Sequence, residues 1–276
     1  MDRAGRADRE WRLIREESWD GATNMALDRV AATTAAAGGP RTLRVYRWKT
    51  STLSLGYHQE PDTVDWAVCE REGIGVTRRP TGGGGIYHDS YGDISYSIVA
   101  PADELPGDLM ETYELLCEPI FEAFDRLGVD AGFAAESLPA IHEPSCYLRE
   151  VHPAHDVVVD GPDDPRKLSG NAQYRRKDAV IQHGSITFES LPERHLSVFS
   201  DPETTPDEFS ERVTSLREQG VESRERAVEA IEASLKEWAD AEDGGWTDEE
   251  LEAARERAER TFASEAWNRH GEDPLD

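Results

Sequence analysis

The sequence contains no long run of apolar residues. None of its apolar stretches approaches the roughly 18 residues that a helix needs to cross a bilayer. The first residues, Met1 to Arg6, lack the apolar segment of a signal peptide. We therefore expect a cytoplasmic protein without a membrane span.

Lysine is scarce among the 276 residues, because it occurs only at Lys49, Lys167, Lys177 and Lys236. Asp and Glu together number 57, and the formal net charge is −27. Aromatic residues are spread along the chain and its apolar periodicity is clear, so we interpret the acidity as solvation of a folded surface rather than as disorder. Such a surface is typical of a halophilic protein in a salt-rich cytoplasm. It also argues against nucleic-acid binding, which needs a basic face.

Cysteine is scarce too. Cys69, Cys117 and Cys146 are widely spaced and form no C-x-x-C motif, so the pattern predicts neither a disulfide framework nor a zinc site. Cys69 and Cys117 lie in apolar helical patterns and are expected in the core. Cys146 lies in a segment rich in His and Pro, and its residues leave open whether this thiol is structural or reactive.

Periodicity predicts both strands and helices. A helix is expected after Asp20-Gly21, with Thr23-Asn24 at its cap, ending before Gly38. Further helices are predicted over 64–71 and 109–127, and Gly128 ends the second of these. From Pro206 the sequence becomes charge-rich and predicts two helices, 211–238 and 248–267, without strands. The predicted strands are 11–14, 43–48, 52–57, 94–99, 156–160, 167–173 and 179–186.

Four consecutive glycines stand between Arg78-Arg79-Pro80-Thr81 and Ile86-Tyr87-His88-Asp89. The glycines of a linker normally stand among Ser, Pro or Glu, whereas these four are enclosed by a pair of arginines on one side and by Ile-Tyr-His-Asp on the other. Without side chains, the backbone N–H groups of Gly82, Gly83 and Gly84 can surround an anion, and the two arginines suit phosphate or carboxylate. The pattern favours a ligand-binding loop over a flexible turn.

Lys167 opens a second conspicuous segment, Lys167 to Gln173. In a chain this poor in lysine, an ammonium group followed by Ser-Gly-Asn suggests a point charge that stabilises a reacting group, although a hairpin lysine is the simpler alternative. A cation near Cys146 would lower the pKa of its thiol and make it a nucleophile.

Histidine gives weaker signals. His88 precedes Asp89, but adjacent side chains seldom face each other, and His183 lies in a predicted strand where it can line a pocket or be structural. We expect no metal, because three other histidines have spacings that match no familiar ligand set. They are His142, His152 and His155.

Taken jointly, these motifs resemble the lipoate–protein ligase A family, whose superfamily shares its catalytic fold with biotin–protein ligases. The resemblance covers most of the chain and rests on Arg78 to Gly84, Ile86 to Asp89, Lys167 to Gln173, Gln182 to Ile186, Asn24 to Asp28 and Phe262 to Asn268. It implies an α/β (α+β) fold in which helices flank a mixed sheet. We expect a catalytic domain over residues 1–205 and a helical C-terminal extension over 206–276.

Two chemistries occur in that superfamily. Lipoate–protein ligases consume ATP to form a lipoyl-adenylate, whereas cysteine-dependent octanoyltransferases take the acyl group from acyl carrier protein through a thioester. We favour the transferase, because Cys146 stands where that branch places its nucleophile and because those enzymes also end in a helical tail. The ligase is the alternative, since Tyr91-Gly92-Asp93 is closer to the ligase version of the loop. A non-catalytic acyl-binding protein is a third possibility, against which Lys167 argues.

The resemblance also implies site residues and partners. Cys146 and Lys167 would be catalytic, without a tightly bound cofactor; ATP and Mg²⁺ would be needed only by a ligase. The acceptor would be a lysine on a lipoyl domain of a 2-oxoacid dehydrogenase complex or on the glycine cleavage H protein, and the donor would be acyl carrier protein or free lipoate. The implied substrate-binding residues are Arg78, Arg79, Thr81, Gly82, Gly83, Gly84, His88, Ser169, Gly170, Asn171 and His183.

Overall fold

A mixed β-sheet runs through the centre of the protein, whose computed structural model describes residues 10–153 and 155–273. The expectation about Met1 to Arg6 lies outside these residues. The strand order is β11-β1-β2-β6-β10-β9-β8-β7, in which β1 pairs in parallel with β2 and β11, and the other neighbours are antiparallel. The bounds are β1 Trp11–Trp19, β2 Arg41–Trp48, β6 Asp93–Pro101, β7 Ala131–Phe133, β8 Asp156–Val159, β9 Arg166–Arg175, β10 Ala179–Thr187 and β11 Glu242–Asp243.

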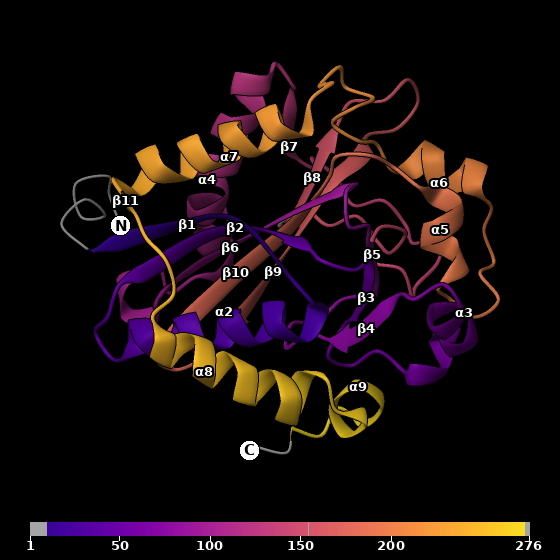
Figure 1. The fold of residues 1–276 in the computed structure, drawn as a ribbon. Coiled ribbons are helices and arrows are strands. Elements are labelled where there is room, and N and C mark those ends of the chain that lie inside the picture. The colour runs from indigo at the N-terminus through magenta and orange to yellow at the C-terminus, as the bar shows by residue number, and fades with distance from the viewer. Residues whose placement is uncertain (1–9, 154, 274–276) are drawn as a thin grey trace.

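Helices cover both faces of this sheet (Figure 1). On one face lie α4 (Leu109–Leu127) and α7 (Arg224–Ala239), and on the other lie α2 (Gly21–Ala36) and α8 (Asp248–Arg257). Alternation along the strands creates the two faces: Tyr96 of β6 joins the core under α4 and α7, whereas Ser97 donates a hydrogen bond to Asp28 of α2. The structure confirms the predicted α/β (α+β) fold with its mixed, helix-flanked sheet.

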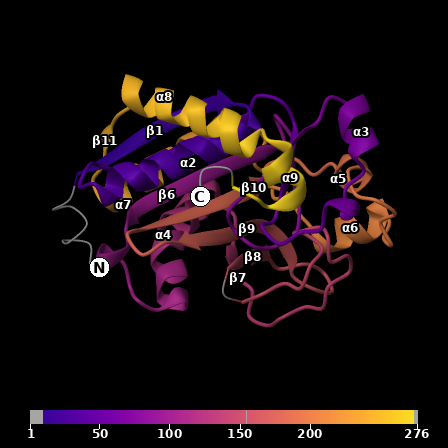
Figure 2. The same ribbon diagram turned by 90° about the horizontal axis from the view of Figure 1, so that it is seen from below.

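A second, smaller sheet stands beside the first. It consists of β4 (Gly75–Arg78), β3 (Thr52–Leu55) and β5 (Ile86–His88), in that order. Three short helices lie on this side of the molecule, as Figure 2 shows: α3 (Trp66–Arg71), α5 (Pro192–Ser197) and α6 (Pro206–Arg212). The glycine loop joins β4 to β5, so the small sheet carries it toward the central sheet.

Several expectations about the elements and their boundaries are wrong. Helix α2 begins at Gly21 and is capped by Asp20, whose carboxylate accepts the Thr23 N–H at 2.9 Å, rather than by Thr23-Asn24. The predicted helix 211–238 is two helices, α6 and α7, because the segment between them hydrogen-bonds to strands β9 and β10. The tail also contains β11, which extends the sheet beside β1.

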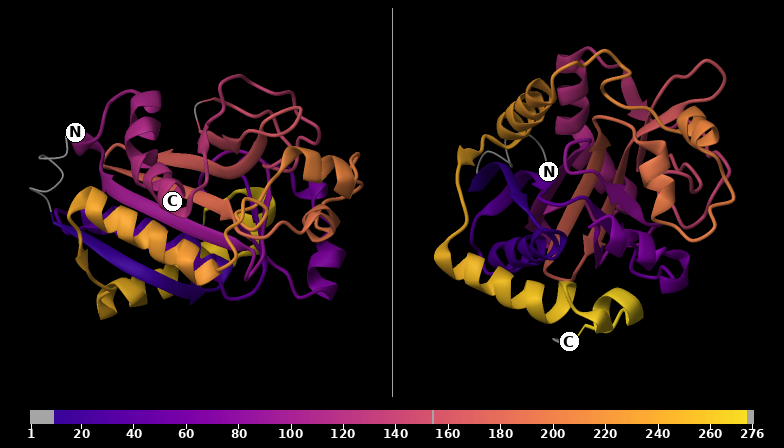
Figure 3. Two further views of the ribbon diagram at one scale, coloured as in Figure 1. Left: turned by 90° about the horizontal axis from the view of Figure 1, so that it is seen from above. Right: turned by 45° about the vertical axis from the view of Figure 1, so that its right-hand side comes forward.

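The C-terminal segment packs against the rest of the chain. Figure 3 shows its yellow helices lying along the indigo N-terminal half, and Ile231 and Leu235 of α7 belong to the same apolar core as the central strands. After α8 the chain makes a π-helical turn (Ala258–Phe262) and ends in α9 (Glu265–His270). The predicted helix 248–267 is therefore interrupted, and the division at residue 205 stays a prediction.

Candidate active site

A cavity of about 380 Å³ opens between the central sheet and the small sheet. Of the residues predicted to be functional, those that line it are Arg79, Gly82, Gly83, His88, Cys146, Lys167, Gly170, Asn171 and His183. Arg78, Thr81, Gly84 and Ser169 are buried but do not line it. The structure therefore brings most of the predicted site together from segments far apart in the sequence.

Cys146 and Lys167 meet in this cavity. The Nζ of Lys167 lies 4.0 Å from the Sγ of Cys146 and donates a hydrogen bond to the Cys146 carbonyl oxygen at 2.9 Å. Lys167 is buried, while Cys146 is partly exposed. Gly170 adjoins both, since a Cβ there would lie 3.6 Å from Nζ and 3.8 Å from Sγ. The cavity thus places a buried ammonium group beside a partly exposed thiol.

Asp156 is a site residue that the sequence prediction missed. Its carboxylate Oδ1 lies 2.8 Å from Lys167 Nζ, and both side chains are almost fully buried. Burial would lower the pKa of Lys167, but Asp156 and Cys146 outweigh burial and raise it. Burial would likewise raise the pKa of Asp156, but Lys167 and His155 hold it well below its ordinary value. Lys167 is therefore a permanent cation at neutral pH.

The glycine loop packs directly against Cys146. The Cys146 N–H donates to the Gly85 carbonyl oxygen at 2.9 Å, and the Gly85 N–H donates to the Pro144 carbonyl oxygen at 2.7 Å. A Cβ on Gly84 would lie only 2.6 Å from the Pro144 oxygen and 2.8 Å from the Cys146 nitrogen. This position requires glycine, because two backbone segments touch there.

Arg79 holds the glycine loop from inside. It is buried, burial lowers its pKa, and its guanidinium points toward the loop's own backbone. Its acceptors are the carbonyl oxygens of Ser54 at 2.8 Å, Gly82 at 2.8 Å and Gly84 at 2.7 Å, and the Thr81 hydroxyl at 3.0 Å. Within the described residues, the N–H groups of Gly82, Gly83 and Gly84 donate to no acceptor. Arg79 thus fixes a loop whose own donors remain available to a ligand.

Arg78 has a different place from the one predicted. Its guanidinium is committed to backbone carbonyl groups outside the cavity, so a role in binding substrate has no geometric support. It links the turn after β3 to α9, and the acceptors are the carbonyl oxygens of Gly56, Tyr57, Gln59, Trp267 and Asn268, at 2.8 to 3.0 Å. In return, Trp267 Nε1 donates to the Arg78 carbonyl oxygen at 2.6 Å. Arg78 therefore positions the strand that leads into the loop.

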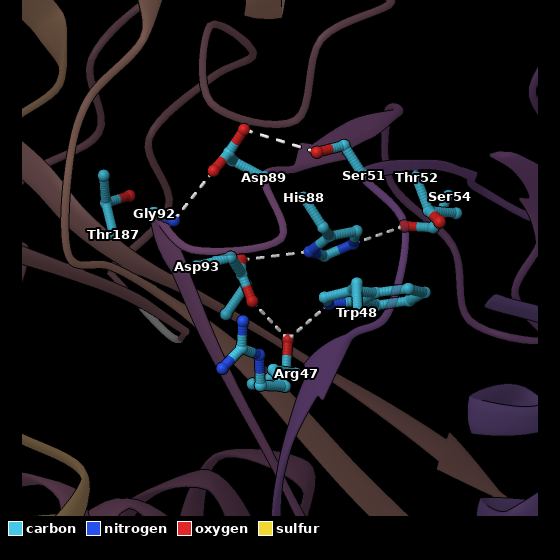
Figure 4. A network of polar contacts seen from close by, with 12 residues as sticks. Arg47, Trp48, Ser51, Thr52, Ser54, His88, Asp89, Gly92, Asp93 and Thr187 are labelled. Atoms are coloured by element: carbon cyan, nitrogen blue, oxygen red, sulfur yellow. Dashed lines mark hydrogen bonds and ion pairs between the residues drawn. The ribbon is translucent and has the colours of Figure 1, made fainter. Parts of the chain in front are cut away.

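His88 belongs to a buried polar network at the inner end of the cavity. Figure 4 shows its ring between Asp93 and Ser54 and alongside the Trp48 ring, which it stacks on at a centroid distance of 4.1 Å. Burial lowers the pKa of His88 more than Asp93 raises it, so the ring is neutral. Nδ1 then donates to Asp93 at 3.0 Å, and Nε2 accepts from the Ser54 hydroxyl at 2.8 Å. As expected, its neighbour Asp89 is not its partner.

His183 connects the cavity to helix α2. Its Nε2 lies 2.9 Å from the Thr81 hydroxyl, and its Nδ1 lies 3.7 Å from Asp28. Asp28 also pairs with the fully buried Arg44 at 3.1 Å. Asn24 belongs to the same cluster, because its side-chain oxygen accepts a hydrogen bond from Arg44 at 2.8 Å. The sequence contained a signal for the cluster, since Asn24 and Asp28 are four residues apart and therefore share one face of the helix.

The other two cysteines lie outside the cavity. Burial raises the pKa of the Cys69 thiol to about 11 and that of Cys117 to about 12. Both are in the core, as predicted. Cys146 is thus the cysteine through which this cavity can offer a nucleophile.

The described residues contain no cluster of three or more His, Cys, Asp or Glu side chains arranged to hold a metal ion. The absence of a catalytic metal stays a prediction. No helix in the described part of the chain is long and apolar enough to span a bilayer.

A thiol, a buried ammonium group and a glycine loop with free donors are the parts of an enzyme that handles an activated carboxyl group. The chain belongs to the lipoyl protein ligase A/B family, because the model of that family's catalytic domain matches residues 20–237. It is 34% identical over 275 residues to octanoyltransferase LipM of Kyrpidia tusciae, covering 94% of this chain and 98% of that protein. It is 30% identical over 280 residues to octanoyltransferase LipM of Bacillus subtilis, covering 94% and 97%.

Solved structures show the same fold. A bipartite lipoate protein ligase from Thermoplasma acidophilum superposes with a TM-score of 0.78 at 23% identity, covering 95% of this chain and 96% of that one. A lipoate-protein ligase A bound with ATP gives a TM-score of 0.76 at 25% identity, covering 94% and 98%. The family and fold make this protein an acyltransferase or a ligase.

Proposed function

We propose that this enzyme transfers an octanoyl or lipoyl group to a lysine of a lipoyl domain, with the acyl thioester of acyl carrier protein as donor and Cys146 as the intermediate carrier. The observation that supports it most directly is the 4.0 Å contact between Cys146 Sγ and Lys167 Nζ inside the cavity. The relatives named octanoyltransferase, which match nearly the full length of the chain, favour the same chemistry.

The first half-reaction loads Cys146. Its thiolate, which lies beside the Lys167 ammonium group, attacks the carbonyl carbon of the donor thioester. The bond to Cys146 Sγ forms, the bond to the carrier's sulfur breaks, and the carrier's thiolate leaves and takes up a proton. Lys167 and the free N–H groups of the glycine loop stabilise the negative charge that develops on the carbonyl oxygen.

The second half-reaction transfers the acyl group from Cys146 to the acceptor lysine. The neutral amine of the acceptor lysine attacks the acyl carbon, the amide bond forms as the nitrogen releases one proton to solvent, and the bond to Cys146 Sγ breaks to restore the thiolate. Asp156 keeps Lys167 charged through both steps, so that the same cation faces the leaving sulfur. The acceptor is a lipoyl domain of a 2-oxoacid dehydrogenase complex or the glycine cleavage H protein.

The cavity suits an acyl chain. Its volume lies in the range of small-molecule sites. Apolar and aromatic side chains contribute much of the inner wall, namely Met25, Tyr46, Trp48 and Ile86, all of them buried. We place the acyl carbon at Cys146 and the hydrocarbon tail toward Trp48.

Intact mass spectrometry tests this proposal. After incubation with octanoyl acyl carrier protein and no ATP, the enzyme should gain one octanoyl group that hydroxylamine removes. Cys146→Ser should gain none, because a serine hydroxyl without a strong base stays protonated. Cys69→Ser, which changes a buried thiol outside the cavity, should load like the wild type.

The alternative is an ATP-dependent lipoate–protein ligase. Two observations favour it: the glycine loop keeps three N–H groups available for a phosphate, and a ligase of this fold binds ATP. ATP and Mg²⁺ would then be needed, and Cys146 would be dispensable. If no acyl-enzyme forms and Cys146→Ser still modifies a lipoyl domain with lipoate and ATP, the ligase assignment replaces the transferase. Binding of acyl groups without turnover under either condition would indicate the third possibility, a binding protein.

A further inference from the structure

His155 lines the cavity beside the Lys167–Asp156 pair, and its side chain is partly exposed to solvent. Its Nδ1 is 3.4 Å from Asp156 Oδ1, the same oxygen that lies 2.8 Å from Lys167 Nζ. The ring stacks on His152 at a centroid distance of 5.0 Å and contacts Tyr113 of α4 at 5.6 Å. The His155 side chain is 35% exposed, whereas Asp156 and Lys167 are buried. An imidazole thus stands where the buried ion pair meets solvent.

The second half-reaction needs a group that accepts a proton. A lysine side chain is an ammonium ion near pH 7, so the acceptor must lose one proton before it attacks and another as the amide forms. Lys167 cannot accept either, because its ammonium group is held by Asp156 and by the Cys146 carbonyl oxygen. The base must be another side chain that lines the cavity.

The deeper histidines are already occupied. His88 has both ring nitrogens hydrogen-bonded, to Asp93 and Ser54, and is buried at the inner end. His183 contacts Thr81 through Nε2. If the acyl chain fills the inner part, the acceptor amine reaches the acyl carbon from the open end, where His155 is exposed.

We propose that His155 is the general base that deprotonates the acceptor lysine, an inference that rests on the transferase mechanism proposed above. Nδ1 is buried 3.4 Å from the Asp156 carboxylate oxygen without making a hydrogen bond to it, and the negative charge there favours the ring proton on Nδ1, so that Nε2 on the opposite edge of the ring offers its lone pair. Nε2 takes a proton from the acceptor ammonium and passes it to solvent, the freed amine attacks the acyl carbon, Nε2 takes the second proton as the amide forms, and the Cys146 thiolate leaves. Imidazolium then returns its proton to solvent through its exposed edge.

The two half-reactions separate this role from a structural one. His155→Ala should load from octanoyl acyl carrier protein as fast as the wild type, because loading involves no amine. Transfer from the purified acyl-enzyme to lipoyl domain should slow by about 100-fold or more, the usual contribution of a general base. Hydroxylamine is an amine that is largely neutral at pH 7, so it should remove the octanoyl group from wild type and variant at equal rates. Added imidazole should restore part of the transfer rate.

His152→Ala is the comparison variant, since it removes the neighbouring imidazole and should lose less of the transfer rate. Equal slowing with lipoyl domain and with hydroxylamine in His155→Ala would assign the residue a structural role and overturn the proposal. An unchanged transfer rate, or a greater loss in His152→Ala, would overturn it as well. If the wild type forms no acyl-enzyme, the proposed function itself fails and this proposal fails with it, a result distinct from all of these.

Discussion

Lys167 and Asp156 form a buried ion pair across two neighbouring antiparallel strands, with 2.8 Å between Nζ and Oδ1. At this point β9 carries one residue more than β8, because Val157 pairs with Ser169 while Val158 pairs with Lys167. Such bulges are frequent beside active sites, where they redirect a side chain. The ion pair therefore fixes the Lys167 ammonium group, which the proposed chemistry needs, to the central sheet.

Lys167→Met should reduce acyl transfer by about 100-fold or more, because it removes the cation beside Cys146 and beside the reacting carbonyl group while keeping most of the side chain's volume. The rate is measured with octanoyl acyl carrier protein and lipoyl domain, and circular dichroism checks that the variant is folded. A folded variant with near-normal turnover would show that the site is placed wrongly.

Asp156→Asn should lower the free energy of unfolding by about 3 kcal/mol at pH 7, because it leaves the Lys167 ammonium buried without its counter-ion. Urea titration followed by tryptophan fluorescence measures the loss. The double variant with Lys167→Met should regain part of it, since both charges are then gone. If Asp156→Asn lowered the free energy of unfolding by no more than the removal of an exposed ion pair does, the result would contradict the burial of the Lys167–Asp156 pair.

Gly84→Ala should impair acyl-enzyme formation, because its Cβ would lie 2.6 Å from the Pro144 oxygen and 2.8 Å from the Cys146 nitrogen and must displace the nucleophile's backbone. Gly82→Ala is the matched control in the same loop, since a Cβ there meets nothing within 4 Å. Loading rates of the two variants are compared by mass spectrometry. Equal rates would mean that contact between the loop and Cys146 does not matter for loading.

Iodoacetamide should alkylate Cys146 in the folded protein near pH 7.5 and leave Cys69 and Cys117 unmodified. Burial raises the pKa of Cys69 to about 11 and of Cys117 to about 12, and neither is accessible, whereas Cys146 is partly exposed beside a cation. Peptide mapping after timed labelling gives the rates. Lys167→Met should slow labelling of Cys146, and faster labelling of either buried thiol would contradict the assignment.

Glu250→Gln should destabilise the protein above pH 5 and have little effect near pH 2. Burial would raise the pKa of Glu250, but hydrogen bonds from Arg12 and Thr34 contribute to lowering it to about 2. A carboxyl group whose pKa is lower in the folded state than its unfolded value of about 4.3 stabilises the fold above that value, and this contribution disappears as pH falls toward 2. Urea unfolding of both proteins at several pH values measures the difference, which must shrink with acidification.

Much of the fold was predictable from the sequence because strands such as β6 alternate and helices such as α4 have one apolar face. Helix α4 was predicted with both of its ends, since Gly128 adopts the left-handed conformation that ends it. The segment between α6 and α7 was not, because its residues bond to strands far away in the sequence. Local patterns carry no information about such contacts.

The site was predictable where motifs are contiguous and obscure where partners are distant. The structure places the glycine loop and Lys167 at the cavity, whereas the guanidinium of Arg78 is bound to backbone carbonyl groups outside it. Asp156 was treated only as the start of a strand, although an acidic residue opening an apolar run and facing Lys167 in the same hairpin was a usable signal. Its pairing depends on a bulge that alternation alone does not reveal.

The contacts between Arg78 and the last helix affect when the active site can form. Arg78 leads into the glycine loop, but its strand is secured by Trp267 and Asn268, nearly two hundred residues later in the chain. During synthesis the loop and Cys146 leave the ribosome long before these partners exist. The site should therefore acquire its final surroundings only once Trp267 and Asn268 have left the ribosome, and chains stalled before Trp267 should carry a core without a finished site.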